Sequence, residues 1–172
     1  DKTWNWVDAT DAWTSSEHVH LGDNKKVILG TGSDLNIYHD GNSMIEHTGA
    51  GNLYIRPKSG ENGIIVKADG AVEAYHDNFK ILETIANGIQ LTGPEASAAN
   101  LNLQADEGDD NADKWKLQAA TDGSFKVANY STGSWVNGLT LDGSNNVTFA
   151  GTVTDSKGEL RTIPQLSKSS AH

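Results

Sequence analysis

The stretch KVILGTGSDLNIYHDGNSMIEHTGAGNLYI, residues 26–55, decides the fold class. It holds short runs in which apolar and polar side chains alternate, such as LNIYH at 35–39. Successive side chains of a strand point to opposite faces, so this alternation predicts a sheet with one apolar and one polar face. Between the runs lie clusters of Gly, Asp and Asn, at 30–33, 39–42 and 48–52, which accept the positive φ of tight turns.

Similar runs recur about every eight to ten residues, and together they predict an all-β fold of short strands joined by Gly, Asn and Asp turns. The predicted strands between Glu17 and Gly93 are HVHL, KVIL, LNIYH, MIEH, NLYIR, GIIVK, VEAYH, FKILET and GIQLTG. Residues 79–86, FKILETIA, also fit two helical turns. We predict a strand there, because YHDGNSMIEHTGAGNLYI from Tyr38 resembles YHDNFKILETIANGIQL from Tyr75. Such a repeat indicates stacked units, each too small to bury its own face.

Changes in composition divide the chain into four predicted segments. PEASAA, from Pro94, marks the main internal boundary, and DG pairs at 122–123 and 142–143 predict hairpin turns in a small antiparallel meander of about five strands beyond it. The tail LSKSSAH suggests a linker, and we expect the chain to be a piece of a longer protein. The segments are a Trp-rich lead-in or connector (1–24), a repeat-containing β segment (25–93), a small antiparallel β module (94–153) and a C-terminal linker (154–172).

The composition is poor in large core side chains. Hydrophobic residues make up 36% of the 172 residues and aromatic residues 7%, while glycine contributes 18. A single chain of this kind buries a modest core, and oligomerisation is a usual remedy. The net charge of −10 argues against nucleic acid and anionic membranes as partners. No run approaches the roughly 18 apolar residues of a membrane span, and the lack of cysteine excludes disulfides and thiolate chemistry.

Several motifs resemble one group of proteins. The wording LGTGSDLNIYHDGNS…GAGNLYIRP (from Leu29) resembles repeats in the tail-fibre and appendage proteins of tailed bacteriophages, especially those of marine and cyanobacterial hosts. Three further segments are similar to parts of the same proteins: WNWVDATDAW (4–13), GSWVNGLTLDGSNNVTFAGTVT (133–154) and KGELRTIPQ (157–165). The four segments cover about half of the chain.

The resemblance implies a structural, adhesive segment of a virion tail fibre or related appendage, without catalytic activity, that supports host attachment. The expected architecture is an intertwined homotrimer, with a β-prism or β-helix-like shaft and the small meander. Expected partners are other virion tail proteins and a host cell-surface glycan or protein. Two other functions stay open: a fragment of a trimeric tailspike polysaccharide depolymerase, and a secreted carbohydrate-binding module.

The residues themselves also predict a homotrimer. Many strands have one apolar face, but the chain has too few large apolar side chains to close a core by itself. Around a threefold axis, each thin apolar face would be covered by two other copies. Leu53 and Ile89 fall on the face that we expect to be buried. A charge introduced at either position should therefore abolish trimer and fold together.

Trp4, Trp6 and Trp13 lie within ten residues of one another in the lead-in. We expect them to pack against neighbouring chains or a preceding domain, because large aromatic side chains rarely stand free in water. The alternative is a glycan-binding site in which the rings stack on a sugar.

His18 and His20, spaced i and i+2 in a predicted strand, would present both imidazoles on one face. Around a threefold axis they would supply six nitrogens, a set suited to a transition metal such as Fe, Ni or Zn. The resemblance also suggests an iron ion on the threefold axis at this position. The alternative is two surface histidines.

Two further groups of polar residues have ordinary explanations. His39 and His76 stand in a repeated Tyr-His-Asp at predicted turns, where the aspartate accepts backbone hydrogen bonds, and no nucleophile motif accompanies them. The acidic loop could bind calcium, but it lacks the EF-hand order, and charge runs of this kind are usually solvated loops. Its members are Asp106, Glu107, Asp109, Asp110 and Asp113.

Overall fold

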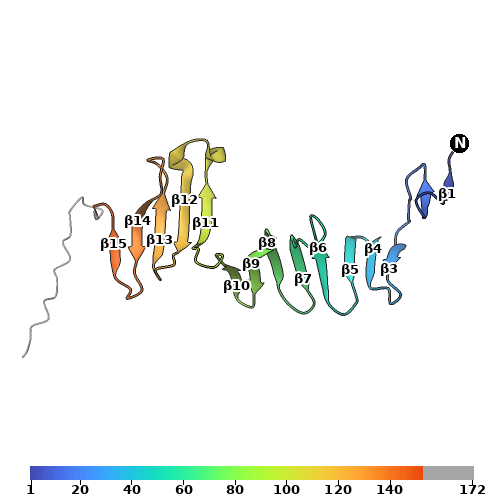
Figure 1. The fold of residues 1–172 in the computed structure, drawn as a ribbon, viewed down its shortest axis with the longest axis horizontal. Helices are drawn as coiled ribbons and strands as arrows, with labels where there is room; N and C mark the ends of the chain where they lie inside the picture. The colour runs from blue at the N-terminus through green and yellow to red at the C-terminus, as the bar shows by residue number, and fades with distance from the viewer. Residues whose placement is uncertain (153–172) are drawn as a thin grey trace, which may run out of the picture.

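The structure is a computed structural model that describes residues 1–152, and it is all-β. Four antiparallel sheets follow one another along an elongated molecule, with the strands lying across its long axis (Figure 1). The KGELRTIPQ motif and the predicted linker 154–172 lie outside the described residues. No helix among residues 1–152 is long and apolar enough to cross a membrane.

The strands of the first two sheets are β1 (Trp4–Val7) and β2 (Ala12–Ser15), then β3 (Lys26–Leu29), β4 (Leu35–His39) and β5 (Ser43–His47). The third sheet holds β6 (Asn52–Ile55), β7 (Ile64–Lys67), β8 (Val72–His76), β9 (Phe79–Ile85) and β10 (Gly88–Leu91). The fourth holds β11 (Ala99–Gln104), β12 (Lys114–Ala119), β13 (Phe125–Asn129), β14 (Val136–Leu141) and β15 (Val147–Phe149). Two 3₁₀ turns, η1 (Asp106–Gly108) and η2 (Asn111–Asp113), connect β11 to β12.

Every sheet is a meander in which strands adjacent in sequence are adjacent in space. Both predicted DG turns are confirmed: Asp122–Gly123 joins β12 to β13, and Asp142–Gly143 joins β14 to β15. The carboxylate of Asp142 explains the second turn, because it accepts the backbone N–H groups of Ser144 and Asn146 at 2.8 and 2.9 Å. The five-stranded meander predicted for this part of the chain is therefore confirmed.

The strand predicted at 79–86 is confirmed as β9, and the helical alternative is wrong. The two copies of the repeat occupy corresponding elements, β4–β6 and β8–β10. One difference separates them. β9 and β10 pair across a tight turn at 86–87, whereas β5 and β6 belong to different sheets joined by 48–51.

The strand predicted for HVHL at 18–21 is wrong, because these residues form no strand. The hydroxyl of Ser15 accepts the Glu17 N–H and donates to the Glu17 carbonyl, which closes a local turn directly after β2. A second turn follows before β3, where the Asn24 N–H donates to the His39 carbonyl at 2.7 Å. An alternating run between two turns becomes a strand only when a neighbouring strand pairs with it, and none does so here among residues 1–152.

Three glycines of the LGTGSD and TGAG motifs lie around one side chain. A Cβ at Gly30, Gly32 or Gly49 would meet the carboxyl group or Cβ of Asp34 at 3.1 Å or less. Gly30 also has φ +88°, which L side chains rarely adopt. The Asp34 backbone carbonyl meanwhile accepts the Thr48 N–H at 2.8 Å, so the β3–β4 and β5–β6 connections are tied together at this point.

We expect Gly30→Ala to lower the free energy of unfolding by about 2 kcal/mol, because the new methyl group meets the Asp34 carboxylate and the backbone is strained. Thermal or urea unfolding followed by circular dichroism measures the effect. Gly22→Ala is the matched control, since nothing lies within 4 Å of its Cβ position. Equal stability of the two variants would contradict the role assigned to this glycine cluster.

Candidate functional site

The sheet β6–β10 has one face that is apolar except for Thr84. Directly paired residues of antiparallel strands place their side chains on the same face, so the register identifies that face. One row across the five strands is Ile55, Ile64, Ala74, Leu82 and Leu91. The next row contains Leu53, Val66 and Val72, and ends with the pair Thr84 and Ile89. We call this surface, together with its counterparts on the neighbouring sheets, the apolar face.

The sheet β11–β15 repeats the arrangement with larger side chains. Its first row is Ala99, Ala119, Phe125, Leu141 and Val147, and its second row is Leu101, Leu117, Val127, Leu139 and Phe149. Leu103 and Trp115 begin a third row. The opposite face of the same strands carries Asn100, Gln118, Lys126, Thr140 and Thr148, so polar residues are absent from the first two apolar rows. Asn129, which pairs with Trp115, interrupts the third row.

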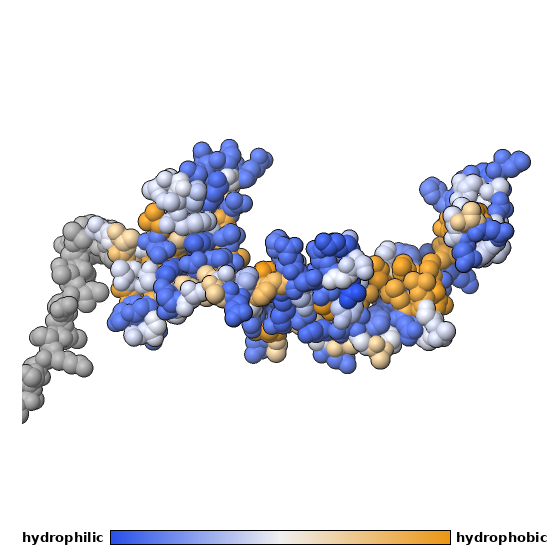
Figure 2. Space-filling model, in the orientation of Figure 1, coloured by the Kyte–Doolittle hydropathy of each residue, from blue (hydrophilic) through white to orange (hydrophobic). Residues whose placement is uncertain are grey.

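The sheet β3–β5 is narrower, and its apolar face carries Val27, Leu29, Leu35, Ile37 and Ile45, with His47 beside Leu35 at one edge. A groove of about 520 Å³ lies over this face, and Val19 and Leu21 from the preceding segment also line it. Figure 2 shows a concentrated hydrophobic area over β3–β5.

The apolar faces of neighbouring sheets meet at two grooves. A groove of about 190 Å³ is lined by Ile45 of β5 together with Leu53 and Val66 of the next sheet. A second, of about 170 Å³, is lined by Leu91 of β10 together with Leu101 and Leu117. The apolar face therefore runs continuously along the molecule from β3 to β15.

Apart from Val19 and Leu21 beside β3–β5, nothing within residues 1–152 covers this face, because each sheet is a single layer. Ile65 and Ala128 are the only buried apolar residues in the described part of the chain, and both lie outside the rows of the apolar face. The whole chain of 18.4 kDa exposes 13610 Å², against about 8,200 Å² for a compact monomer of this mass. Even if residues 153–172 contributed the roughly 3,000 Å² of an unfolded segment, the excess would persist.

The opposite face of β6–β10 carries a buried ionic network. Glu73 is only 2% exposed, and its carboxylate lies 2.8 Å from the Lys67 ammonium and 3.2 Å from that of Lys80. The Tyr75 hydroxyl donates to the same carboxylate at 2.7 Å. The lysine contacts, first that of Lys67, and the tyrosine hydrogen bond lower the pKa of Glu73 to about 2 against the effect of burial.

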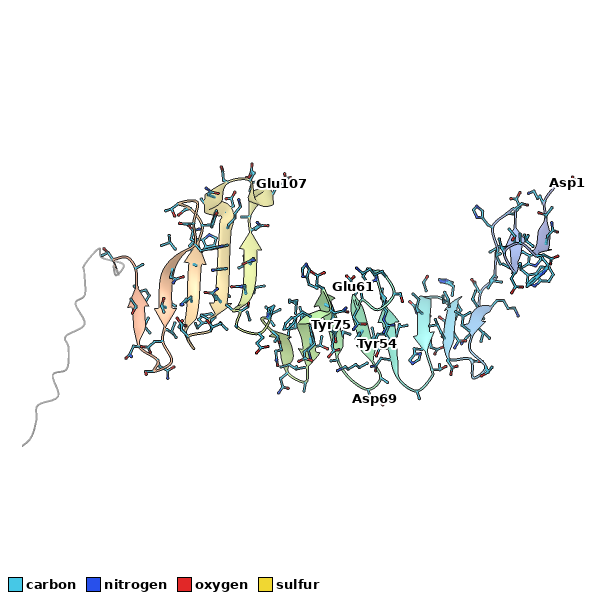
Figure 3. The ribbon with its side chains drawn as sticks, in the orientation of Figure 1. Asp1, Tyr54, Glu61, Asp69, Tyr75 and Glu107 are labelled. Carbon is cyan, nitrogen blue, oxygen red and sulfur yellow. The ribbon has the colours of Figure 1, made fainter. Side chains whose placement is uncertain are left out.

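This network distinguishes the two faces of the sheet, because it buries a charged group on one of them within the single chain. Figure 3 labels Tyr54 and Tyr75 within β6–β10 and shows Glu61 and Asp69 at opposite margins of the sheet. On the side that carries the charges, the single chain buries Glu73 and Ile65, whereas the side that carries the aliphatic residues is half exposed. The candidate functional site is therefore the apolar face, a surface that requires a partner.

Trp4, Trp6 and Trp13 share one face of the β1–β2 hairpin. Trp6 pairs directly with Trp13, with ring centroids 6.0 Å apart, and the Trp4 ring stacks on Trp13 at 6.5 Å. The sequence did not predict this mutual stacking. All three rings remain about half exposed, so partner-chain packing and glycan stacking both stay predictions.

The His18 and His20 metal site also stays a prediction. It assumed a strand with both imidazoles directed to the inside of an assembly. Val19 and Leu21, rather than the histidines, line the groove over β3–β5. No three His, Cys, Asp or Glu side chains converge on a metal-sized site among residues 1–152 of one chain, and this includes the acidic loop of η1 and η2.

His39 and His76 lie at the ends of β4 and β8, where turns begin, and both are exposed. The His39 Nδ1 atom lies 3.4 Å from the Ser43 hydroxyl, and the His76 Nδ1 atom lies 3.8 Å from the Asp77 carboxylate. The turn role predicted for Asp40 is seen only as a long contact of 3.5 Å with the Asn42 N–H.

Two residues, Glu73 and His47, were not predicted from the sequence to be of interest. Glu73 alternates correctly onto the polar face, but nothing in the local pattern shows that its carboxylate is buried. The Nε2 atom of His47 is buried without a hydrogen-bond partner in the described structure, beside the groove that joins β5 to β6.

Comparison with known proteins adds no identification. No family model matches the sequence, and no curated protein matches it. The resemblance to bacteriophage tail fibres therefore rests on the motifs quoted above.

Proposed function

We propose that the chain is a structural segment of a homotrimeric fibre, of the kind found in bacteriophage tail fibres and related virion appendages, that supports attachment to the host. One observation carries the proposal: a continuous apolar face, half exposed in the single chain, runs along an elongated row of single-layer sheets. Such a face needs cover along its whole length, and other copies of the same chain supply an equally long apolar face.

The dimensions support three copies around an axis parallel to the row of sheets. Most strands of the longer sheets have four to six residues, so each sheet forms a wall about 13–20 Å wide. Three such walls in a triangle leave the axis about 4–6 Å from each wall, within reach of Val, Leu, Ile and Phe side chains. The wider walls of β11–β15 also carry the larger side chains, Trp115, Phe125 and Phe149.

The outer surface supports the same arrangement. With the apolar faces inward, the polar faces are directed to water, and the ionic network of Glu73 already closes one of them. The net charge of −10 per chain keeps such an outer surface soluble. In this assembly the fibre holds other virion parts at a distance from one another, and it requires no catalytic residues.

Native mass spectrometry or light scattering of the purified chain tests the proposal. We expect a particle of three times the chain mass of 18.4 kDa at micromolar concentration, because burial of the apolar face drives association. A stable, folded monomer would end the proposal. A dimer would keep the apolar face as an interface but exclude the threefold arrangement.

A further inference from the structure

The outer, polar side of the β11–β15 sheet carries one pair of interacting aromatic rings. The Tyr130 and Trp135 rings meet edge to face, with centroids 5.2 Å apart. Lys114 and Lys116 project from β12 toward the same place, with ammonium groups 5.9 Å from the Tyr130 ring centroid and 4.8 Å from that of Trp135. We call these four residues the aromatic platform. Trp115, between the two lysines, lies on the apolar face instead.

The platform is held in place by the turn that joins β13 to β14. The Gly133 N–H donates to the Tyr130 carbonyl at 2.9 Å, and Gly133 has φ +82°. The Asn129 side chain accepts the Ser131 N–H at 2.8 Å and donates to the Lys114 carbonyl at 3.2 Å. Trp135 nevertheless remains 38% exposed. The rings are therefore ordered before any ligand arrives, which lowers the entropic cost of binding.

The two lysines differ from most lysines on the outer faces. Lys26, Lys67, Lys80 and Lys126 each lie within 4 Å of a carboxylate. Within residues 1–152, no carboxylate lies that close to Lys114 or Lys116, although the acidic loop precedes Lys114 directly in sequence. Two ammonium groups beside ordered rings are thus free to meet an anion.

We infer that the aromatic platform binds a saccharide that carries a carboxylate, such as a uronic acid unit. The apolar C–H face of a sugar ring stacks on the exposed part of Trp135, and the carboxylate accepts hydrogen bonds from Lys116 and Lys114. Nucleic acid, the other common anionic ligand of aromatic and basic sites, requires a patch of several Lys and Arg side chains along its backbone, whereas the platform offers two lysines. This inference does not depend on the number of copies in the assembly, because the platform lies on the polar side of its sheet.

Isothermal titration calorimetry on the purified chain tests the site, with galacturonic acid trisaccharide as the probe and galactose trisaccharide as its neutral counterpart. We expect the acidic probe to bind about tenfold more tightly, since only it can pair with the lysines. Trp135→Ala should weaken binding of the acidic probe about tenfold through lost stacking. Lys116→Gln should remove most of the preference for the acidic probe. Tyr54→Ala is the matched control, an outer aromatic residue beside a cation on another sheet, and should bind as the wild type does.

Three results would overturn the inference: no heat from the acidic probe at millimolar concentration, equal affinity for the two trisaccharides, or unchanged binding by Trp135→Ala. If Trp135→Ala does not fold, as judged by circular dichroism, Lys116→Gln decides, because that substitution replaces a partly exposed side chain without removing a ring. A failure here would leave the expected mass of the particle unaffected, so the two proposals fail separately.

Discussion

Ile89→Asp is expected to abolish both assembly and folded structure. Ile89 is 66% exposed in the single chain, so in a monomer this substitution would change the free energy of unfolding by about 0.5 kcal/mol at most. If the apolar face is buried between copies, the same substitution places an unpaired carboxylate in an apolar interior, which costs several kcal/mol. Leu53→Asp, on the same row at the other end of the sheet, should behave alike. Native mass and far-ultraviolet circular dichroism measure the two effects together.

Asn52→Asp provides the matched control for Leu53→Asp. It introduces the same carboxylate one residue away, on the polar face, where Asn52 pairs with Lys67. We expect this variant to keep the mass and melting temperature of the wild type within the small range of surface substitutions. An Ile89→Asp protein that assembles and melts normally would show that the apolar face is not an interface between copies.

Glu73→Gln should destabilise the folded chain by about 2–3 kcal/mol. The substitution keeps the shape of the side chain but removes the charge that Lys67, Lys80 and Tyr75 hold in place. Glu46→Gln is the control, because Glu46 forms a more exposed pair with Lys26 at 3.1 Å, and such pairs contribute about 0.5 kcal/mol. Chemical denaturation at pH 7 compares the two variants.

The same residue predicts how stability depends on pH. The pKa of Glu73 is about 2 in the folded chain, below its ordinary value of 4.5. A depressed pKa contributes stability that is fully present above pH 4.5 and is lost as the pH falls toward 2. The wild type should therefore lose stability over that interval, and Glu73→Gln should lose less. Parallel pH curves for the two proteins would contradict the assignment.

The sequence by itself determined the strands from Lys26 onward and their two faces. The alternation of KVIL, LNIYH and GIIVK specifies which residues share a face, and this local period of two needs no information from the rest of the chain. It also placed β9 correctly, through the repeat that begins at Tyr38 and Tyr75. Turn chemistry is equally local, which is why the DG pairs at 122–123 and 142–143 were predicted correctly.

The sequence did not determine which strands pair with one another. HVHL alternates as well as any true strand, yet no strand in the described part of the chain pairs with it, because turns after Ser15 and at Asn24 direct the chain elsewhere. The break between β5 and β6 is also invisible locally, since the equivalent strands β9 and β10 do pair. A hydrogen bond between strands depends on where a second segment lies, and alternation carries no information about that position.

Only the tertiary structure decided which face of each sheet is covered. Charged side chains are usually exposed and aliphatic side chains buried, but here Glu73 is buried and Ile89 is more than half exposed. Glu73 is buried because two lysines and a tyrosine from three strands converge on it, a coincidence of register across β7, β8 and β9. Ile89 is exposed because each sheet is a single layer, and burial of an apolar side chain requires a second layer that this chain does not supply within residues 1–152.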